Sequence, residues 1–181
     1  MNLEKFAIEV HDNAVKHGFW EKTDLPTRLA LIHAEWSEAL EEYRAGRPLV
    51  WYNGKKPEGV AIELIDGCLR ILDIMGENGW VPTDYVPGLR PTPFTKLVAV
   101  HQAAPLPEFV AELHLFVSDA WKCALNQPSR IGTQGLYNMH FDRALREAMG
   151  WVDAHGYSAE SLLKEKHEYN LTRPYMHGKK I

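Results

Sequence analysis

Residues 31–44 read LIHAEWSEALEEYR, and their spacing indicates an amphipathic helix with an unusual amount of negative charge. Glu35, Glu38 and Glu42 lie at positions i, i+3 and i+7, so they share one stripe of that helix. Large apolar side chains occupy the flank that would pack against the protein: Leu29, Ile32, Trp36, Leu40 and Tyr43. The stretch predicts a helix over about 26–45 that presents carboxylates beside a hydrophobic core.

The segment 59–79, GVAIELIDGCLRILDIMGENG, combines acids and apolar residues in the same way. Glu63, Asp66, Arg70 and Asp73 form a second polar stripe, on a helix predicted over about 58–77. Apolar residues crowd both sides of this stripe: Val60, Ile62, Ile65, Leu69, Leu72 and Met75. Because the stripe is so narrow, we expect part of it to be buried.

Antiparallel packing of these two helices, as between neighbours in a bundle, would bring the two acidic stripes together. The carboxylates that would converge are Glu35, Glu38, Glu63 and Asp66. Two carboxylates about 4 Å apart repel by roughly 4 kcal/mol at an effective dielectric of about 20, so such a cluster needs protons or a cation. Oxygen ligands without His or Cys are typical of Mg²⁺ or Mn²⁺ sites. Solvated helix faces are the alternative, whereas a di-iron bundle is disfavoured because no glutamate has a histidine three residues later.

Helical periodicity dominates the rest of the chain, and we find no pair of alternating runs joined by a hairpin signal. The predicted fold class is therefore all-α, a helical bundle. Further helices are expected over about 3–18, 94–104, 107–125, 136–155 and 158–168, with a turn-rich connection after residue 45. The prolines of WVPTDYVPGLRPTP, residues 80–93, argue against a continuous helix there and mark a boundary.

The second half of the chain resembles the first, which indicates an internal duplication. The segment 140–157, HFDRALREAMGWVDAHGY, aligns without a gap to the segment 63–80, ELIDGCLRILDIMGENGW. This alignment matches His140 to Glu63 and Arg143 to Asp66. We therefore expect one compact unit. Residues 1–80 would form the half with the acidic metal site, and residues 81–181 a degenerate helical repeat plus a C-terminal tail.

Composition excludes several classes of function. The chain has 181 residues, 45% of them hydrophobic, and a formal net charge of −4, which argues against a nucleic-acid partner. No run of eighteen apolar residues is present, so we expect no membrane partner. The first residues, MNLEKFAIEV, lack the apolar core of a secretory signal, which favours a cytoplasmic protein. Cys68 and Cys123 provide no disulfide framework and are expected to be buried thiols.

The pairs EWSE, residues 35–38, and ELID, residues 63–66, resemble the ExxE and ExxD motifs of the MazG-like all-α nucleoside triphosphate pyrophosphohydrolases. The flanking SEALEEYRAGRP, KPEGVAIELIDGCLRILDIMGENG and C-terminal KHEYNLTRPYMHGKKI also resemble that family, whereas residues 81–135 match weakly. The resemblance implies a MazG-like helical fold and two or more Mg²⁺ ions, for which Mn²⁺ can substitute. It also implies cleavage of a nucleotide between the α and β phosphates, giving a monophosphate and pyrophosphate.

Carried over by position, the family's metal ligands would be Glu35, Glu38, Glu63 and Asp66. Glu35, Glu38 or the neighbouring Glu42 would orient the attacking water. Phosphoryl transfer requires charge neutralisation and in-line placement more than covalent catalysis, so the absence of a phosphate-binding P-loop is no objection.

The C-terminal segment offers groups that suit a nucleotide. Lys166 and Asn170 are four residues apart and share a helix face, where an ammonium group could meet phosphates and an amide could meet a base or sugar. The resemblance implies that these two residues and Tyr169 line the nucleotide site. Arg173 belongs to the same block, and its guanidinium suits phosphate. The alternative is that the tail only packs on the surface of the bundle and contacts no ligand. This alternative is favoured for His177, Lys179 and Lys180.

Several aromatic residues could also meet a base. Trp36 could stack on one, but its apolar neighbours favour a place in the core. Trp51 and Tyr52, with Lys55 and Lys56 nearby, are better placed to cover a ligand.

The expected activity is Mg²⁺-dependent hydrolysis of (deoxy)ribonucleoside triphosphates, for pool sanitation or for monophosphate supply. A purine substrate is slightly favoured, and a homo-oligomer is expected because such bundles commonly associate. Two alternatives stay open: a non-catalytic helical interaction module, and a phosphoribosyl-ATP pyrophosphohydrolase-like enzyme of the same superfamily.

Overall fold

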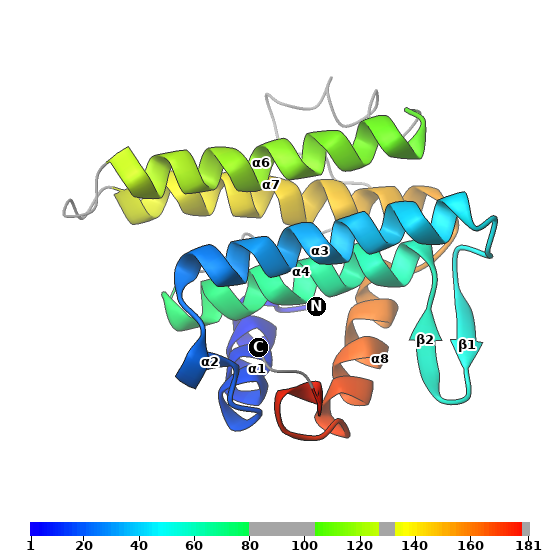
Figure 1. Cartoon of the computed structure of the whole chain (residues 1–181), viewed down its shortest axis with the longest axis horizontal. Helices are drawn as coiled ribbons and strands as arrows, with labels where there is room; N and C mark the ends of the chain where they lie inside the picture. Colours follow the sequence, from blue (N-terminus) through cyan, green and yellow to red (C-terminus); the bar gives the residue numbers. More distant parts are fainter. Residues whose placement is uncertain (80–103, 127–132, 179–181) are drawn as a thin grey trace.

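The computed structural model describes residues 1–79, 104–126 and 133–178, and these residues form a layered helical assembly (Figure 1). Helix α4 (Val60–Glu77) lies at its centre. It packs against α3 (Leu25–Arg44) and α7 (Thr133–Ala154), and α6 (Leu106–Asn126) completes that layer by packing on α3 and α7. On the opposite side, α1 (Leu3–Lys16) and α8 (Ala159–Leu171) contact α4.

Local sequence signals position the two acidic helices. The side chain of Asp24 caps α3 by accepting a hydrogen bond from the backbone N–H of Thr27 at 3.0 Å, and Pro26 lies in the first turn. Helix α4 begins after Gly59, which has φ 110°. A Cβ atom there would lie 2.7 Å from the carbonyl oxygen of Leu49, so this close approach of two backbone segments requires glycine.

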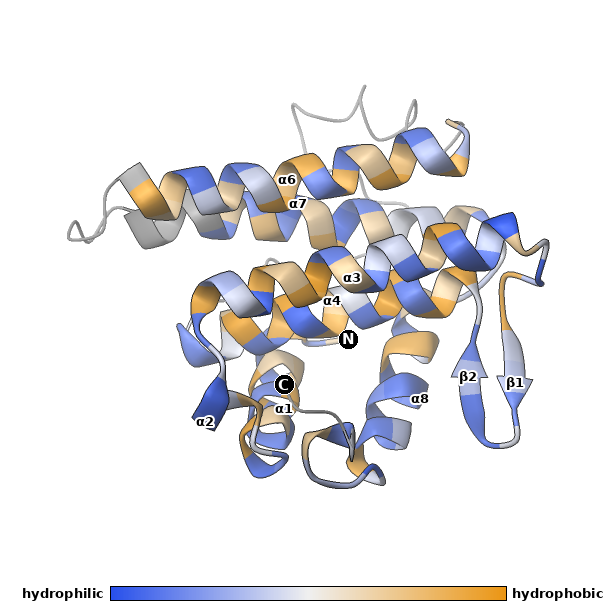
Figure 2. Cartoon of the chain, viewed as in Figure 1, coloured by the Kyte–Doolittle hydropathy of each residue, from blue (hydrophilic) through white to orange (hydrophobic). Residues whose placement is uncertain are grey.

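The hydrophobic core is continuous from the first half to the second. Trp36 is fully buried in it, which confirms the core position expected for this residue. Leu145 on α7 is also fully buried, and its carbonyl oxygen lies 4.0 Å from Sγ of Cys68 on α4. The ribbons of α3 and α4 carry both hydrophobic and hydrophilic residues along their length (Figure 2). Cys68 is a buried thiol as expected, but Cys123 on α6 is partly exposed, which corrects the expectation for that residue.

The helices expected over 26–45, 58–77, 107–125 and 136–155 are confirmed as α3, α4, α6 and α7. The first expected helix ends earlier, at Lys16, and a short helix α2 (Phe19–Lys22) follows it. The last one extends to Leu171, and a 3-10 turn η1 (Tyr175–Gly178) follows. The helix expected over 94–104 lies almost entirely outside the described residues. No helix in the described ranges is long and apolar enough to cross a membrane. The internal duplication stays a prediction.

A small hairpin corrects the expectation of a turn-rich connection without strands. Strands β1 (Trp51–Asn53) and β2 (Lys56–Glu58) pair antiparallel, with Asn53 opposite Lys56. The Asn53–Gly54 pair is a hairpin signal, and Gly54 adopts φ 63°. Sequence analysis missed it because the flanking strands are short and contain Pro57 and charged residues. The described part of the chain is otherwise helical, in agreement with the predicted class.

Candidate functional site

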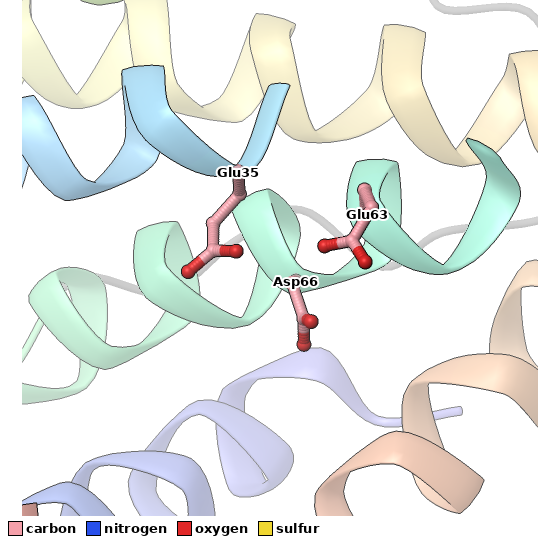
Figure 3. Close-up of side chains that lie close together, drawn as sticks. All are labelled: Glu35, Glu63 and Asp66. Carbon is pink, nitrogen blue, oxygen red and sulfur yellow. The ribbon is translucent and has the colours of Figure 1, made fainter. Parts of the chain in front are cut away.

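Three of the four predicted ligands come together in space. Oxygen atoms of Glu35, Glu63 and Asp66, one from each side chain, all lie within 4.8 Å of one another. Glu35 comes from α3, whereas Glu63 and Asp66 come from successive turns of α4 (Figure 3). The expected convergence of two acidic helices is therefore observed for these three side chains.

The cluster holds more negative charge than its surroundings can solvate. Burial, together with the neighbouring Asp66, raises the pKa of Glu63 to about 8, and the Glu63 residue is only 5% exposed. Burial also raises the pKa of Asp66, to about 6, although Lys166 acts in the opposite direction. The geometry thus favours uptake of positive charge, either as protons or as a cation.

Two side chains already supply positive charge at this position. Nε of Arg70 donates to Oε1 of Glu35 at 2.6 Å, so an arginine of α4 neutralises the acid of α3. Nζ of Lys166, from α8, lies 2.9 Å from Oδ2 of Asp66 and donates to the carbonyl oxygen of Pro57 at 3.2 Å. Lys166 is 1% exposed, which is rare for lysine and requires such partners.

A cavity of about 210 Å³ connects the acids to the C-terminal segment. Its acidic wall includes the three clustered carboxylates and Glu38. Its remaining wall comes from α1, α2, α3, α4, the hairpin and the C-terminal segment. The residues there are Val10, Asn13, Ala14, Phe19, Leu31, Lys56, Leu69, Arg70, Asp73, Lys166, His167, Asn170, Arg173 and His177.

Glu38 and Glu42 lie differently from their expected positions. Glu38 lines the cavity but is not a member of the close carboxylate cluster. Glu42 does not line the cavity. Its two carboxylate oxygens bind Arg47 at 2.7 Å and the indole N–H of Trp51 at 2.8 Å, so Glu42 fixes the hairpin instead of facing the other acids.

The C-terminal segment supplies three of its four predicted residues to the cavity. Lys166 and Asn170 line it from one face of α8, as their spacing suggests, and Arg173 lines it from the segment just after that helix. Tyr169 does not, and Nζ of Lys166 lies 5.9 Å from the centre of its ring. Of the hairpin group expected to cover a ligand, Lys56 alone reaches the cavity lining.

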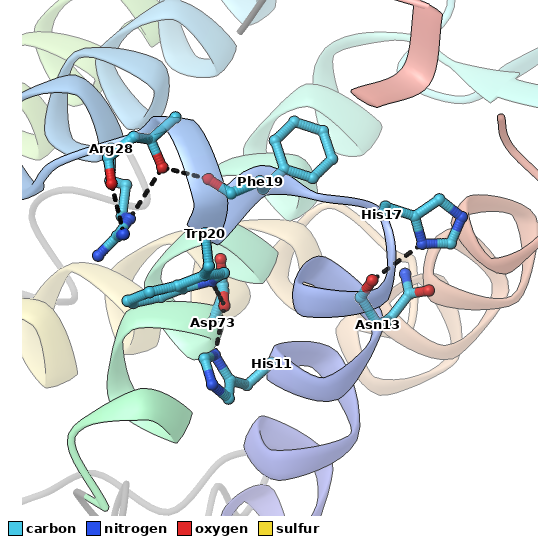
Figure 4. Close-up of polar contacts among 8 residues, drawn as sticks. His11, Asn13, His17, Phe19, Trp20, Arg28 and Asp73 are labelled. Carbon is cyan, nitrogen blue, oxygen red and sulfur yellow. Dashed lines mark hydrogen bonds and ion pairs between the residues drawn. The ribbon is translucent and has the colours of Figure 1, made fainter. Parts of the chain in front are cut away.

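The end of the cavity formed by α1 and α2 is a hydrogen-bonded network (Figure 4). Oδ1 of Asp73 lies 2.9 Å from Nδ1 of His11 and accepts a hydrogen bond from the indole N–H of Trp20 at 2.8 Å. The guanidinium of Arg28 stacks over the Trp20 ring at 3.2 Å. The hydrogen bond to Asp73 raises the pKa of His11. This network fixes α1 and α2 against α4, beside the part of the cavity lining that includes Asp73.

The C-terminal tail, residues 172–178, packs against His17 at the end of α1. The backbone N–H of Met176 donates to the carbonyl oxygen of His17 at 2.9 Å, and Nε2 of His17 lies 2.9 Å from the carbonyl oxygen of Arg173. Met176 and His177 both adopt φ 51°, an uncommon conformation outside glycine that these contacts maintain. His177 therefore does more than cover the bundle surface, because it lines the cavity. Lys179 and Lys180 lie outside the described residues.

Sequence reasoning missed the contribution of α1. Asn13 lines the cavity although it stands in no motif, and so does His167 of α8, which the sequence analysis did not single out within the C-terminal block. Asn13 follows Val10 at i+3 on an otherwise apolar face, and a buried amide at such a position was the available signal. Comparison with protein-family models, with curated proteins and with solved structures finds no match for this chain.

Proposed function

We propose that this protein is a divalent-cation-dependent nucleotide pyrophosphohydrolase, an enzyme that hydrolyses a phosphoric anhydride. Its substrate would be a (deoxy)ribonucleoside triphosphate, cleaved between the α and β phosphates into a monophosphate and pyrophosphate. The observation that carries the proposal is one cavity lined both by the carboxylate cluster and by Lys166, Asn170 and Arg173. The resemblance of EWSE and ELID to the MazG-like motifs supports the same reaction.

The donor set fits Mg²⁺, with Mn²⁺ as a substitute. Glu35, Glu63 and Asp66 offer only oxygen atoms, which Mg²⁺ prefers, and the raised pKa values of Glu63 and Asp66 reflect negative charge that a cation would relieve. Glu38 lies on the same cavity wall and would complete the set of ligands. When bound, such ions neutralise phosphate charge and lower the pKa of a coordinated water.

The basic side chains of the cavity would bind and orient the phosphates. Arg70 and Lys166 now neutralise Glu35 and Asp66, and the entry of divalent charge would release both for phosphate oxygens. Arg173 can add a two-pronged guanidinium contact. In the balanced reaction, the water oxygen bonds to the α or β phosphorus and its proton goes to a nearby base or to solvent. The bond from that phosphorus to the bridging oxygen breaks, and the bridging oxygen leaves with the other phosphate fragment.

The test is an assay of the purified protein with Mg²⁺ and each common (d)NTP, in which nucleotide products and released phosphates are resolved by chromatography. Glu63→Gln should abolish turnover, because it removes a negative ligand from the centre of the cluster. Glu41→Gln is the matched control, because Glu41 lies on α3 but is exposed and paired with Arg44.

The proposal predicts monophosphate and pyrophosphate from the wild type and from Glu41→Gln. It also predicts that Mg²⁺ raises the melting temperature of these two proteins and not that of Glu63→Gln. Diphosphate and orthophosphate would overturn α,β cleavage. No turnover and no stabilisation by metal would leave the helical interaction module as the better hypothesis, and turnover of phosphoribosyl-ATP alone would favour that branch of the superfamily.

A further inference from the structure

Two amides at the cavity have hydrogen-bonding capacity that the described part of the protein does not use. Asn13 on α1 is 7% exposed, and its Oδ1 atom is buried without a hydrogen-bond partner among residues 1–79, 104–126 and 133–178. Asn170 on α8 also has a buried Oδ1 atom without a partner in these ranges. Both residues line the same cavity (Asn13 is drawn in Figure 4). A buried carbonyl oxygen without a donor costs free energy, so two of them beside one cavity indicate a ligand that supplies donors.

Asn13 comes from α1 and Asn170 from α8, one turn beyond Lys166, whereas the clustered carboxylates come from α3 and α4. His11, two residues before Asn13, binds Asp73, which is seven residues beyond Asp66 on α4. At a rise of 1.5 Å per residue, the position on α4 that His11 contacts lies about 10 Å along the helix from Asp66. This separation leaves room for a sugar between phosphates held at the acids and a base held at α1.

The walls at this end suit a flat, partly apolar group. Val10, Ala14 and Phe19 line the cavity around Asn13 and provide an apolar surface for a ring. A volume of about 210 Å³ is below the roughly 300–1,000 Å³ of typical ligand pockets, so the cavity would enclose only part of a nucleotide. The terminal torsion of asparagine is soft, so either amide can turn its oxygen toward a ligand without backbone movement.

We infer that Asn13 and Asn170 read the base of the substrate, and that this base carries an exocyclic amino group. Two unused acceptors match a base edge with two N–H donors. The amino groups of adenine and cytosine provide such an edge, as do N1–H and the 2-amino group of guanine. Uracil, thymine and hypoxanthine each offer one N–H on that edge and leave one buried acceptor unsatisfied. The inference rests on the proposed function and adds a substrate class to it.

The test uses pairs of substrates that differ at the amino group, dCTP against dUTP and dGTP against dITP, with wild type, Asn13→Leu and Asn138→Leu. Leucine has nearly the shape of asparagine without its polar atoms. Asn138 is the matched control, because it is a buried amide on α7 whose Oδ1 also lacks a partner and which does not line the cavity. Binding of the deoxynucleosides alone, measured by NMR titration, reports on the base end independently of metal and phosphate.

The wild type should prefer at least one amino-bearing substrate over its partner by about tenfold or more in kcat/KM, as expected for one satisfied buried acceptor. Asn13→Leu should lose this ratio, mainly through a higher KM for the amino-bearing substrate, while Asn138→Leu retains it. The inference is overturned if both variants behave alike, or if dUTP and dITP are the better substrates.

Failure of the inference can be told apart from failure of the proposed function. If the protein hydrolyses triphosphates and Asn13→Leu has no effect on substrate preference, Asn13 does not read the base, but the proposed enzymatic function stands. Preferential binding of deoxycytidine or deoxyguanosine that depends on Asn13, without hydrolysis of any triphosphate, keeps the base site and removes the enzyme. Absence of both binding and hydrolysis removes both.

Discussion

At the scale of single residues, the acidic cluster depends on a buried cation. Lys166 is 1% exposed and lies 2.9 Å from Asp66, so its ammonium and that carboxylate stabilise each other in a poorly solvated place. A buried ion pair adds little to the free energy of unfolding compared with a hydrophobic pair of the same size. Removing one partner is nevertheless costly, because the other charge is left buried and uncompensated.

Lys166→Met should lower the free energy of unfolding by about 3 kcal/mol without divalent ions, because Asp66 loses its partner. Added Mg²⁺ should restore part of this loss if the acids bind it. Urea denaturation with and without Mg²⁺ measures both effects. The control is Lys164→Met on the same helix, where an exposed pair with Glu160 should contribute less than about 1 kcal/mol. Equal losses in the two variants would contradict the prediction.

His11 should make the stability depend on pH. Its hydrogen bond to Asp73 raises its pKa above 6.5, so its contribution is fully present below pH 6.5 and is lost as the pH rises through the raised value. His11→Gln should be less stable than the wild type by about 1 kcal/mol at pH 6, and the difference should shrink by pH 8.5. Thermal unfolding across this range measures it. His140→Gln, on α7 and outside this network, should show no such trend.

At the scale of the elements, the approach of α3 to α4 sets the distance between the acids. Gly67 lies beneath the indole of Trp36, where any Cβ atom would overlap the ring. This contact allows the two helices to come close enough for Glu35 to meet Glu63 and Asp66. The acidic cluster therefore depends on a glycine that has no polar role.

Gly67→Ala should destabilise the fold by about 2 kcal/mol or more, because the close-packed crossing must open. It should also weaken any effect of Mg²⁺ on the melting temperature, since the acids move apart. Chemical denaturation and thermal shift measure the two effects. Trp36→Phe in the Gly67→Ala background should recover part of the stability by making room. A Gly67→Ala protein as stable as the wild type would show that α3 and α4 do not pack in this way.

At the scale of the whole molecule, the layer of α6 and α7 and the acidic half share one core. Phe109 on α6 and Leu145 on α7 belong to the same buried cluster as Trp36 on α3. Because the hydrophobic face of α3 and α4 is covered by this layer, the described parts should unfold together.

Leu145→Ala should lower the free energy of unfolding by about 3 kcal/mol, because it leaves a cavity at a fully buried position. The loss should appear in one cooperative transition. Urea denaturation followed by far-UV circular dichroism and by tryptophan fluorescence should give coincident curves. Two separated transitions, of which only one moves in the variant, would instead indicate two independent folding units.

Much of the candidate site could be predicted from the sequence because its determinants are local. The 3.6-residue period of a helix places Glu63 and Asp66 on one face of α4, and Lys166 and Asn170 on one face of α8. The cap at Asp24 marks where α3 begins. Other placements depend on contacts between distant segments. Glu42 was expected as a residue that could orient the attacking water, yet Trp51 of the hairpin and Arg47 of the preceding loop bind its two oxygens.

The sequence by itself determined the class of fold, the main helices and the acids that α3 and α4 present, because helical periodicity and capping act over a few residues. Tertiary structure alone decided which of those acids meet, that Arg70 and Lys166 neutralise them, and that Asn13 borders the same cavity. The physical reason is that such contacts depend on crossing distances, which buried residues such as Gly67 and Trp36 set and which no local pattern encodes.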